Sequence, residues 1–297
     1  MSPLLLAAVL LAADASPLDQ ARQFTQVGKY EEALDACTAA EKALKPDDAA
    51  GQARLAIGRA DVQAATGKTD EAIAGLSKLA AGAKPSPDVL ARLADLEFRR
   101  GKWDQADAHA KQALALDKDH LQARWVAVRL KLGHGENAEA DLRWFIDHFN
   151  AQRAAYEKDP DALLIVGQAA ERYYWSKAQG DDLAEGLNDV LNDLYERAIK
   201  VDPRCWQSAW LQGELFLKGF REPSARKELN RALLINPSAA EVLVDLGKLD
   251  LEGYKLADGR RRATDALEIN PDLAAAHVLK ADCDISDERF ADAHEAA

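Results

Sequence analysis

Apolar and small residues recur along most of this chain with the spacing of amphipathic helices. In one stretch Leu90, Leu93 and Ala94 are followed by Ala106 and Ala110, so that apolar positions return every three or four residues. The chain shows no strict alternation of polar and apolar residues, which is the pattern of a half-buried strand. The sequence therefore predicts an all-α protein made of many short helices, with no sheet.

Similar residues also return at one fixed interval of 34 residues in both halves of the chain. The interval separates three glycines, the alanines that follow them, and three prolines further on. The stretches before the prolines, IKVDP, LLINP and LEINP, are near copies. Because independent residue types keep one period, the chain contains an internal repeat. The positions are Gly67, Gly101 and Gly135; Ala72, Ala106 and Ala140; and Pro203, Pro237 and Pro271.

A 34-residue period with this content resembles the tetratricopeptide repeat, a helix–turn–helix unit whose copies stack into a right-handed α-solenoid. The resemblance covers residues 16–297 and implies about eight units. The fifth has about twelve extra residues in its hairpin, and the eighth stops before its second helix is complete. The units are 16–46, 53–86, 87–120, 121–154, 160–205, 206–239, 240–273 and 274–297.

Specific residue types suit this architecture. Gly101 and its equivalents follow the first helix of a unit, helix A, where a left-handed residue is needed to turn the chain. The prolines end the second helix, helix B, because they cannot continue it. Small residues are expected where the two helices cross at about 8–10 Å. These are Ala94, Val128, Gly213, Gly247 and Ala281 on helix A, and Ala106 and Ala140 on helix B.

The N-terminus has the pattern of an export signal. Residues 4–13 form an apolar run of ten, about half of the roughly 20 residues needed to span a membrane. Ala13-Asp14-Ala15 matches the A-x-A pattern of signal-peptide cleavage. We therefore expect residues 1–15 to be a signal peptide and the protein to be periplasmic or extracellular. The alternative is a cytoplasmic protein in which this run is a buried helix packed on the first repeat.

Composition excludes several functions. The chain has 38 Lys and Arg against 50 Asp and Glu, a net charge of −12, which argues against nucleic-acid and anionic-membrane binding. Gly67-Lys68-Thr69 resembles the end of a phosphate loop, but Val62 stands where the first glycine would be. The three cysteines and six histidines have no metal-ligand spacing. We expect no nucleotide, metal or other cofactor and no catalysis, and we interpret Arg260 to Arg262 as a solvated convex face.

The resemblance implies a concave groove lined by helix A of each unit. In such arrays the groove residues stand at the second, fifth, ninth and twelfth or thirteenth places of a unit. Trp125 and Trp210 either face this groove or pack against the next repeat, and the sequence leaves both readings open. The Lys/Asn pattern that holds a terminal carboxylate in some members is absent. The positions are Asp95, Arg99, Trp125, Arg129, Trp210, Glu214, Lys218 and Lys248.

Three functions fit these observations. The first is a non-catalytic scaffold that binds a protein or peptide partner in the groove. The second is the N-terminal part of a longer exported protein with an enzymatic, metallopeptidase-like domain. The incomplete eighth unit favours it, since Leu273, Val278, Leu279 and Phe290 would need a downstream domain or partner to cover them. The third is an envelope-polymer binder that uses Trp125, Trp210 and the aromatic residues 173–175 as stacking faces.

Overall fold

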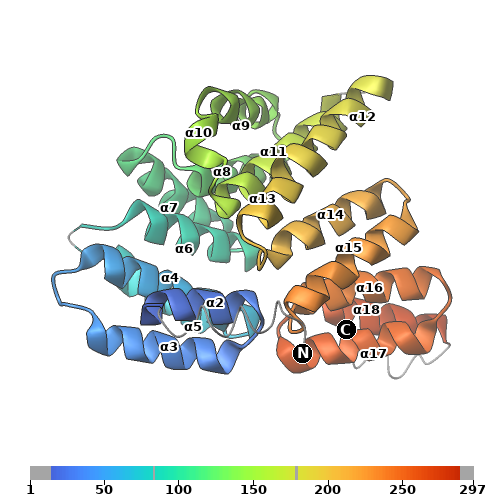
Figure 1. Cartoon of the computed structure of the whole chain (residues 1–297), viewed down its shortest axis with the longest axis horizontal. Helices are drawn as coiled ribbons and strands as arrows, with labels where there is room; N and C mark the ends of the chain where they lie inside the picture. The colour runs from blue at the N-terminus through green and yellow to red at the C-terminus, as the bar shows by residue number, and fades with distance from the viewer. Residues whose placement is uncertain (1–14, 83, 178–179, 288–297) are drawn as a thin grey trace.

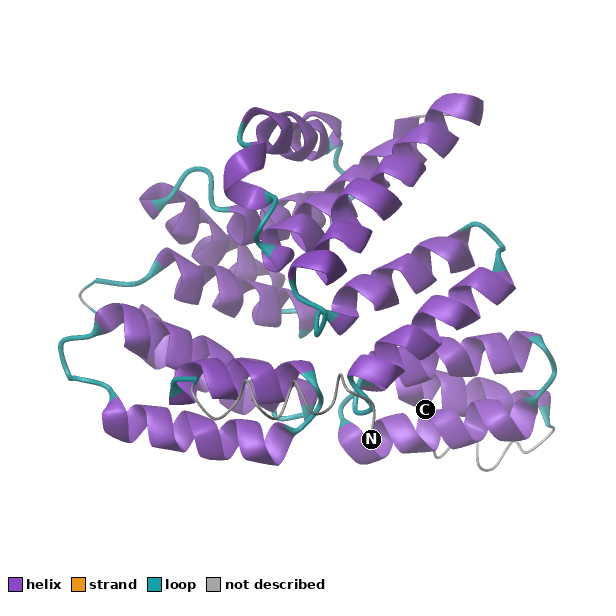
Figure 2. Ribbon diagram, in the orientation of Figure 1, coloured by secondary structure: helices purple, strands orange, loops and turns teal. Residues whose placement is uncertain are grey.

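The structure is a computed structural model that describes residues 15–82, 84–177 and 180–287. Within these ranges every regular element is helical, as Figure 2 shows, so the all-α prediction is confirmed. In the same ranges no helix is long and apolar enough to cross a lipid bilayer. The elements are α2 (Pro17–Gln26), α3 (Tyr30–Ala43), α4 (Ala49–Ala65), α5 (Thr69–Ala80), α6 (Pro87–Arg99), α7 (Trp103–Leu116), α8 (Leu121–Gly133), α9 (Glu139–Ala151), α10 (Arg153–Tyr156), α11 (Pro160–Lys177), α12 (Gly180–Asp189), the π-helix η1 (Val190–Tyr195), α13 (Glu196–Val201), α14 (Trp206–Lys218), α15 (Glu222–Ile235), α16 (Ala240–Glu252), α17 (Leu256–Ile269) and α18 (Ala274–Ser286).

Consecutive helices pair, and the pairs stack side by side into a curved array (Figure 1). Helix α6 packs on α7, α14 on α15, and α16 on α17. The apolar core runs between units as well as within them. Trp206 of α14, Leu229 of α15 and Leu246 of α16 belong to one buried cluster. Each pair therefore needs its neighbour to bury its apolar face, which makes the array one continuous structure.

The turns between paired helices pass through left-handed backbone. Gly28, Gly67, Gly101 and Gly135 have φ angles of +74°, +81°, +72° and +74°. Glycine takes this conformation without steric cost because it has no Cβ. The prediction that Gly101 and its equivalents turn the chain is therefore confirmed.

Two later turns place aromatic residues in this backbone region instead of glycine. Phe220 and Tyr254 have φ of 54° and 55° and are 96% and 89% exposed. An L-residue in this conformation costs roughly 1–2 kcal/mol relative to right-handed backbone. Nothing in the structure explains why glycine is not used here.

Small residues occupy the helix crossings, as predicted, with one exception. A Cβ added to Gly213 would lie 2.7 Å from the Leu229 side chain of the paired helix. One added to Gly247 would lie 3.3 Å from the Gly259 carbonyl oxygen of the paired helix and 2.4 Å from Leu279 of the next unit. Ala140, however, is exposed. The repeat period would start α9 at residue 137 (103 plus 34), but it starts at Glu139. This two-residue shift turns Ala140 outward and makes its placement at the crossing wrong.

The hairpin after α10 is longer than the others. Its first arm, α11, has 18 residues, and its second arm consists of α12, η1 and α13. Aromatic rings fill the space between the arms. A Cβ on Gly167 would lie 2.3 Å from the Tyr195 ring, and one on Gly186 would lie 2.3 Å from the Tyr174 ring. The two glycines therefore let large rings pack against the opposite helix.

Buried acidic residues join neighbouring units through arginines. Arg226 of α15 lies 2.9 Å from Asp250 of α16, and 34 residues later Arg260 of α17 pairs with Asp284 of α18. Arg262 also binds Asp250, at 2.6 Å. Residues 260 to 262 are therefore not simply a solvated face, because two of the three arginines hold buried carboxylates.

The surface of α18 differs in part from the sequence expectation. Val278 is 59% exposed, as expected, but Leu279 is buried against Gly247 and Leu273 is partly buried. Leu279 is buried because Gly247 has no Cβ and leaves room for the leucine side chain. Phe290, the end of the eighth unit and residues 1–14 of the expected signal peptide lie outside the described residues.

The first units of the array touch the last ones, although 200 residues separate them in the chain (Figure 1). The Tyr30 hydroxyl donates to the Ser238 carbonyl oxygen at 3.1 Å and accepts a 3.4 Å hydrogen bond from the Asn236 amide. One unit further, the Asn270 amide donates to the Ala64 carbonyl oxygen at 3.3 Å. We call these the closing contacts.

The closing contacts join equivalent parts of successive units. Turn glycines 28 and 67 lie against Asn236 and Asn270, which belong to the two INP sequences of the repeat. Arg100 adds an ion pair of 3.6 Å with Asp272 beside them. The curvature of the array therefore brings the turns within the first two units, at Gly28 and Gly67, against the turns between later units, at Asn236 and Asn270. The first turn meets the first of these and the second meets the next.

We predict that Gly28→Val with Gly67→Val opens the array. A Cβ would lie 2.2 Å from Asn236 Oδ1 at Gly28, and 3.0 Å from Asn270 Oδ1 and Pro271 Cδ at Gly67. The closing contacts should separate, and small-angle X-ray scattering should report a larger radius of gyration. A radius equal to that of the unmodified protein would show that these contacts do not hold the ends together.

The matched control is Gly101→Val with Gly135→Val. These glycines have similar φ angles, but a Cβ on either meets nothing within 4 Å. The control carries the same backbone strain, which we expect to destabilise its units by about 1–2 kcal/mol per site. It should lower the melting temperature and leave the radius of gyration unchanged. An unchanged melting curve would contradict the role given to the left-handed turn.

Candidate functional site

A cavity of about 370 Å³ lies between α6, α8, α11 and α14, all of which are first helices of their units. Phe98, Trp125 and Arg129 line one side of it. Helices α11 and α14 supply most of the charged groups on the other side. Ligand pockets commonly measure about 300–1,000 Å³, so this cavity is large enough for part of a ligand. The charged groups are Glu171, Arg172, Glu214 and Lys218.

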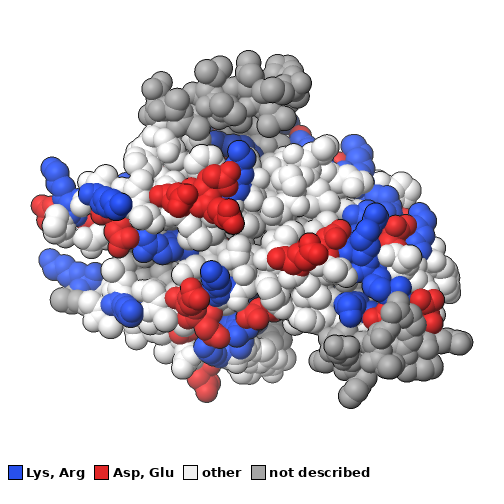
Figure 3. All heavy atoms as spheres, turned by 90° about the horizontal axis from the view of Figure 1, so that it is seen from below, with Lys and Arg blue, Asp and Glu red and all other residues white. Residues whose placement is uncertain are grey.

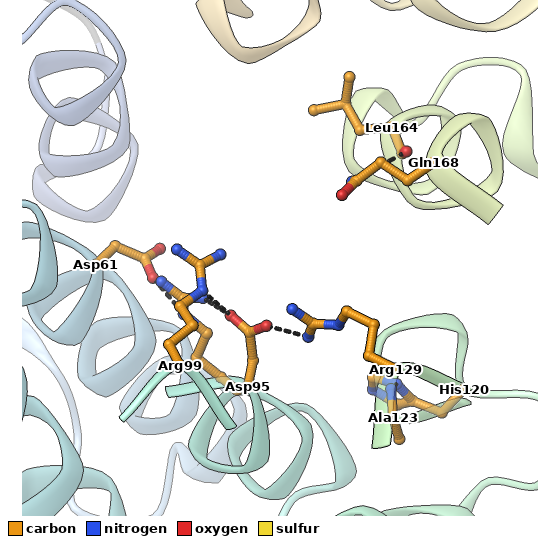
Figure 4. A network of polar contacts seen from close by, with 9 residues as sticks. Asp61, Asp95, Arg99, His120, Ala123, Arg129, Leu164 and Gln168 are labelled. Carbon is orange, nitrogen blue, oxygen red and sulfur yellow. Dashed lines mark hydrogen bonds and ion pairs between the residues drawn. The ribbon is translucent and has the colours of Figure 1, made fainter. Parts of the chain in front are cut away.

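Asp95 of α6 organises the arginines at one end of this region. Its carboxylate accepts from Arg92 at 2.6 Å, lies 3.1 Å from Arg99 Nε, and binds Arg129 of the next unit. Figure 4 shows Asp95 between Arg99 and Arg129. Asp61, labelled on the far side of the cluster, accepts a second hydrogen bond from Arg92 at 2.7 Å.

The charge of Asp95 is strongly stabilised. Burial alone would raise its pKa, since only 1% of its side chain is exposed. The positive charges of Arg99, Arg129 and Arg92 outweigh that effect and hold the pKa of the carboxyl well below its usual range. Asp95 is therefore ionised at neutral pH and is covered by the arginines that it positions. The exposed groups at this point are the arginines and not the carboxylate.

The opposite wall is organised in a similar way by a buried glutamate. Glu171 of α11 accepts from Lys218 Nζ of α14 at 2.6 Å. It also accepts from the Tyr195 hydroxyl at 3.2 Å. Burial, and then the charge of Glu171, raise the pKa of Tyr195 well above its ordinary value, so Tyr195 stays a hydrogen-bond donor. This carboxylate fixes a lysine at the cavity and ties η1 to the groove helices.

Further along the array, Asp245 of α16 repeats this arrangement. Trp210 Nε1 donates to Asp245 Oδ2 at 2.7 Å, and Lys248 Nζ donates to Oδ1 at 2.9 Å. Asp245 is buried, whereas half of the Lys248 side chain is exposed. Basic side chains held by buried carboxylates therefore continue beyond the cavity along the later units, and we call this series the polar row.

Glu214 differs from these acids because no hydrogen bond or ion pair within the described part of the chain engages its carboxylate. Its pKa is raised to about 7, first by burial and then by the charge of Asp245. Glu171 raises it further, and only Lys218 and Lys248 oppose the shift. Glu214 is thus a partly buried acid that loses its proton near neutral pH.

The two predicted groove tryptophans pack against other aromatic rings and do not stand exposed in the groove. Trp125 is 7% exposed and meets the Phe145 ring edge-on at 6.1 Å. Trp210 is partly buried, stacks obliquely on Trp206 at 6.0 Å, and uses its indole N–H on Asp245. One edge of Trp125 still reaches the cavity. These rings do not present the open faces that a polymer-stacking site needs.

The structure brings most of the predicted groove residues to this region. Trp125, Arg129, Glu214 and Lys218 line the cavity. Asp95 and Arg99 lie beside Arg129. Trp210 is on α14 with Glu214, and Lys248 lies one unit further along, where both Trp210 and Lys248 bind Asp245. Whether a partner contacts these residues stays a prediction.

The sequence reasoning missed three cavity residues of α11. Gln168, Glu171 and Arg172 stand at the ninth, twelfth and thirteenth places of a unit that starts at residue 160, so the positional rule would have found them. Arg92 and Asp245 both stand at the sixth place, which the rule omits. Only their contacts show that they belong to the polar row.

The described residues contain no metal-ligand cluster, and their cysteines are not activated. Across 15–82, 84–177 and 180–287, no group of three or more His, Cys, Asp or Glu is placed to hold a metal ion. Cys37, Cys205 and Cys283 are buried free thiols. Burial raises the pKa of each of them, for Cys205 to about 12, so they stay protonated and poorly nucleophilic. On the face in Figure 3, basic and acidic side chains are interspersed.

Comparisons with known proteins agree with this architecture. A family profile described as tetratricopeptide repeat matches residues 192–241. A tetratricopeptide repeat protein from Parabacteroides merdae is 16% identical with a TM-score of 0.52, over 90% of this chain and 97% of its own. No curated protein matches at a significant level.

Two larger assemblies contain similar chains. One is the APC/C hetero-tetramer Cut9–Hcn1, at 11% identity and a TM-score of 0.61, over 94% of this chain and 52% of that one. The other is the human IFIT1 dimer with PPP-AAAA, at 12% and 0.59, over 94% and 70%. At these identities the likeness concerns the fold alone. The fold of this chain is therefore an all-α helical repeat similar to that of tetratricopeptide repeat proteins, and one repeat is matched directly at residues 192–241.

We predict that Asp95→Ala destabilises the protein by about 3–5 kcal/mol at pH 7, because three arginines would lose their shared buried partner. The folded pKa of Asp95 lies below the unfolded value of about 3.9, so its contribution is complete above that pH and declines as the pH falls below it. Urea unfolding at pH 7 and pH 3 should show a smaller difference between variant and parent at pH 3.

Asp258→Ala is the control for that experiment. Asp258 pairs with Arg261 at 3.0 Å, but both side chains are more than half exposed. Exposed pairs contribute about 0–1 kcal/mol. A loss as large as that of Asp95→Ala would show that the Asp95 cluster has no special weight.

Proposed function

We propose that this protein is a non-catalytic scaffold that binds a segment of a protein partner along its concave groove. The observation that carries the proposal is the cavity between α6, α8, α11 and α14, whose charged walls are fixed by buried carboxylates. Helix positions held by such contacts lose little entropy when a ligand binds. Helical repeat arrays of this kind generally serve as interaction scaffolds, which supports the same reading.

Binding without catalysis fits the chemistry of the site. The three thiols are buried and protonated, and Glu214 is the cavity acid whose pKa lies near 7. A general acid or base acts on a reacting group together with a nucleophile or an electrophilic partner. Glu214 has lysines and other carboxylates around it instead, so we assign it to recognition.

A nucleic-acid ligand is the weaker reading, although the similar IFIT1 structure contains PPP-AAAA. A phosphate backbone needs a net basic surface. The net charge of this chain is −12, and Glu171 and Glu214 both line its cavity. A phosphate chain would therefore meet the carboxylates of Glu171 and Glu214 beside the cations of the cavity.

Export stays a prediction of the N-terminal sequence. Ser16 caps α2, its side chain accepting from the Asp19 amide, so cleavage after Ala15 would leave the first described helix complete. N-terminal sequencing of the protein from its native source should give a chain that starts at Ser16. A chain that keeps residues 1–15 would contradict the signal-peptide prediction.

The test of the binding proposal compares a groove variant with a matched surface variant on an array of immobilised peptides. Arg172→Ala removes an exposed cavity cation that makes no hydrogen bond or ion pair among the described residues. Lys42→Ala removes one exposed charge from α3, a second helix of its unit. Peptides bound by the parent should lose affinity about threefold or more for Arg172→Ala, as expected for one lost charge contact.

The same peptides should bind Lys42→Ala as they bind the parent. Equal binding of every peptide to all three proteins, or no peptide binding, would show that the cavity is not a peptide site.

A further inference from the structure

The cavity lining contains charged groups of both signs. Arg129 of α8 and Arg172 of α11 are cations of this lining, and Glu214 of α14 is an acid of the same lining. Arg129 belongs to a cluster in which arginines outnumber acids, and Glu214 belongs to a cluster in which acids outnumber lysines. Both groups face the same cavity.

On the basic side, arginines outnumber the acids that hold them. Arg92, Arg99 and Arg129 share Asp95, and the one further acid in the cluster is Asp61. The crowding is reflected in Arg129, whose pKa is lowered by burial and then by Arg99 and Arg92, against the pull of Asp95.

Arg129 also has an unused donor. Its Nε is buried and has no hydrogen-bond partner in the described structure. Its guanidinium carbon lies 4.5 Å from the centroid of the Phe98 ring, and both residues line the cavity. Arg172 adds an exposed guanidinium to the same lining. A buried donor without a partner costs about 1–3 kcal/mol, so the cluster around Arg129 holds more donors than acceptors.

On the acidic side, carboxylates outnumber ammonium groups. Glu171, Glu214 and Asp245 face Lys218 and Lys248, and each lysine already binds one of the other two acids. Glu214 is left without an ion pair. A cation placed beside it would neutralise a carboxylate that is partly removed from water, which is a favourable position for a positive charge.

We infer that the cavity selects a peptide segment carrying one acidic and one basic side chain, the acidic group at Arg129 and Arg172 and the basic group at Glu214. This inference rests on the proposed function and specifies its ligand. Leu132 and Leu211 also line the cavity, so apolar residues suit the positions between the two charges. The polar row continues to Trp210, Asp245 and Lys248 outside the cavity, which favours a continuous chain segment over a free small zwitterion.

The test uses blocked peptides of nine residues with acetylated and amidated ends. Their central part contains one of four residue pairs: Glu and Lys, Gln and Lys, Glu and Gln, or Gln and Gln. Each pair is made with one, two or three leucines between its members, and the four peptides with the best spacing are then compared. Affinities for the parent protein are measured by calorimetry at low salt. The Glu/Lys peptide at its best spacing should bind about tenfold more tightly than the Gln/Gln peptide, since two charge contacts of several-fold each add.

Two protein variants test which protein residue contacts each charge of the peptide. In Glu214→Gln, replacing the peptide Lys by Gln should no longer change the affinity, while replacing the peptide Glu should still weaken binding. In Arg172→Gln the pattern should reverse, with the effect of the peptide Glu reduced and that of the Lys unchanged. Such cycles isolate one pairwise contact. Lys42→Gln should leave all four affinities as in the parent.

The pH dependence gives an independent readout. Because the pKa of Glu214 in the free protein is about 7, the acid is mostly protonated at pH 6 and mostly ionised at pH 8. A basic side chain prefers the ionised form, so affinity for the Gln/Lys peptide should rise several-fold from pH 6 to pH 8. The groups that face Glu214 are Glu171, Lys218, Asp245 and Lys248, and all are retained in Glu214→Gln, whose affinity should stay flat.

Equal binding of the four peptides to the parent, or equal charge effects in both variants, would overturn the inference. If array peptides still distinguish Arg172→Ala from Lys42→Ala in that case, the groove binds peptides by other contacts and the proposed function stands. If neither experiment detects binding, both are wrong.

Discussion

The close packing of neighbouring helices is the constraint on which the rest of this structure depends. It needs residues without bulk at fixed points, such as Gly213 against Leu229 of its paired helix and Gly247 against Leu279 of the next unit. A larger side chain at these points would force the helices apart and change the angle between successive units. Because each unit copies the geometry of the last, small errors would accumulate along the array. The curvature, the groove and the closing contacts all follow from these crossings.

Buried carboxylates form the second layer of organisation. Asp95, Glu171 and Asp245 each lie on a first helix and each hold a basic side chain of the same unit or a neighbouring one. A buried charge is tolerated only with partners, so these acids specify which basic groups lie along the groove and in what order. The result is a surface whose charges are fixed before any ligand arrives. Glu214 departs from this pattern, because no ion pair among the described residues engages its carboxylate.

The closing contacts relate the repeat period to the shape of the whole protein. Asn236 and Asn270 end second helices in copies of one sequence motif, yet both also meet turns of the first two units. The contacts are few and polar: hydrogen bonds from Tyr30 and Asn270 and an ion pair from Arg100. Polar contacts of this size contribute about 0.5–1.5 kcal/mol each. They join the ends of the described array, and the core packing between units supplies most of its stability.

The sequence by itself determined the helical class, the 34-residue repeat, the left-handed turn at Gly101 and the small residues at most crossings. Those features are local, since they depend on residues within one repeat or its immediate copy. Ala140 was misplaced because a two-residue shift in the start of α9 does not change the repeat pattern that the sequence displays.

The tertiary structure decided the properties that depend on which side chains meet. Only the packing shows that Trp125 lies against Phe145, and that Arg260 and Arg262 bind the buried acids Asp284 and Asp250. The contact of Tyr30 with Ser238, and the imbalance of charge around Glu214, depend on how curvature accumulates over many units. Sequence spacing carries no information about that accumulated angle, because the angle is set by contacts between helices.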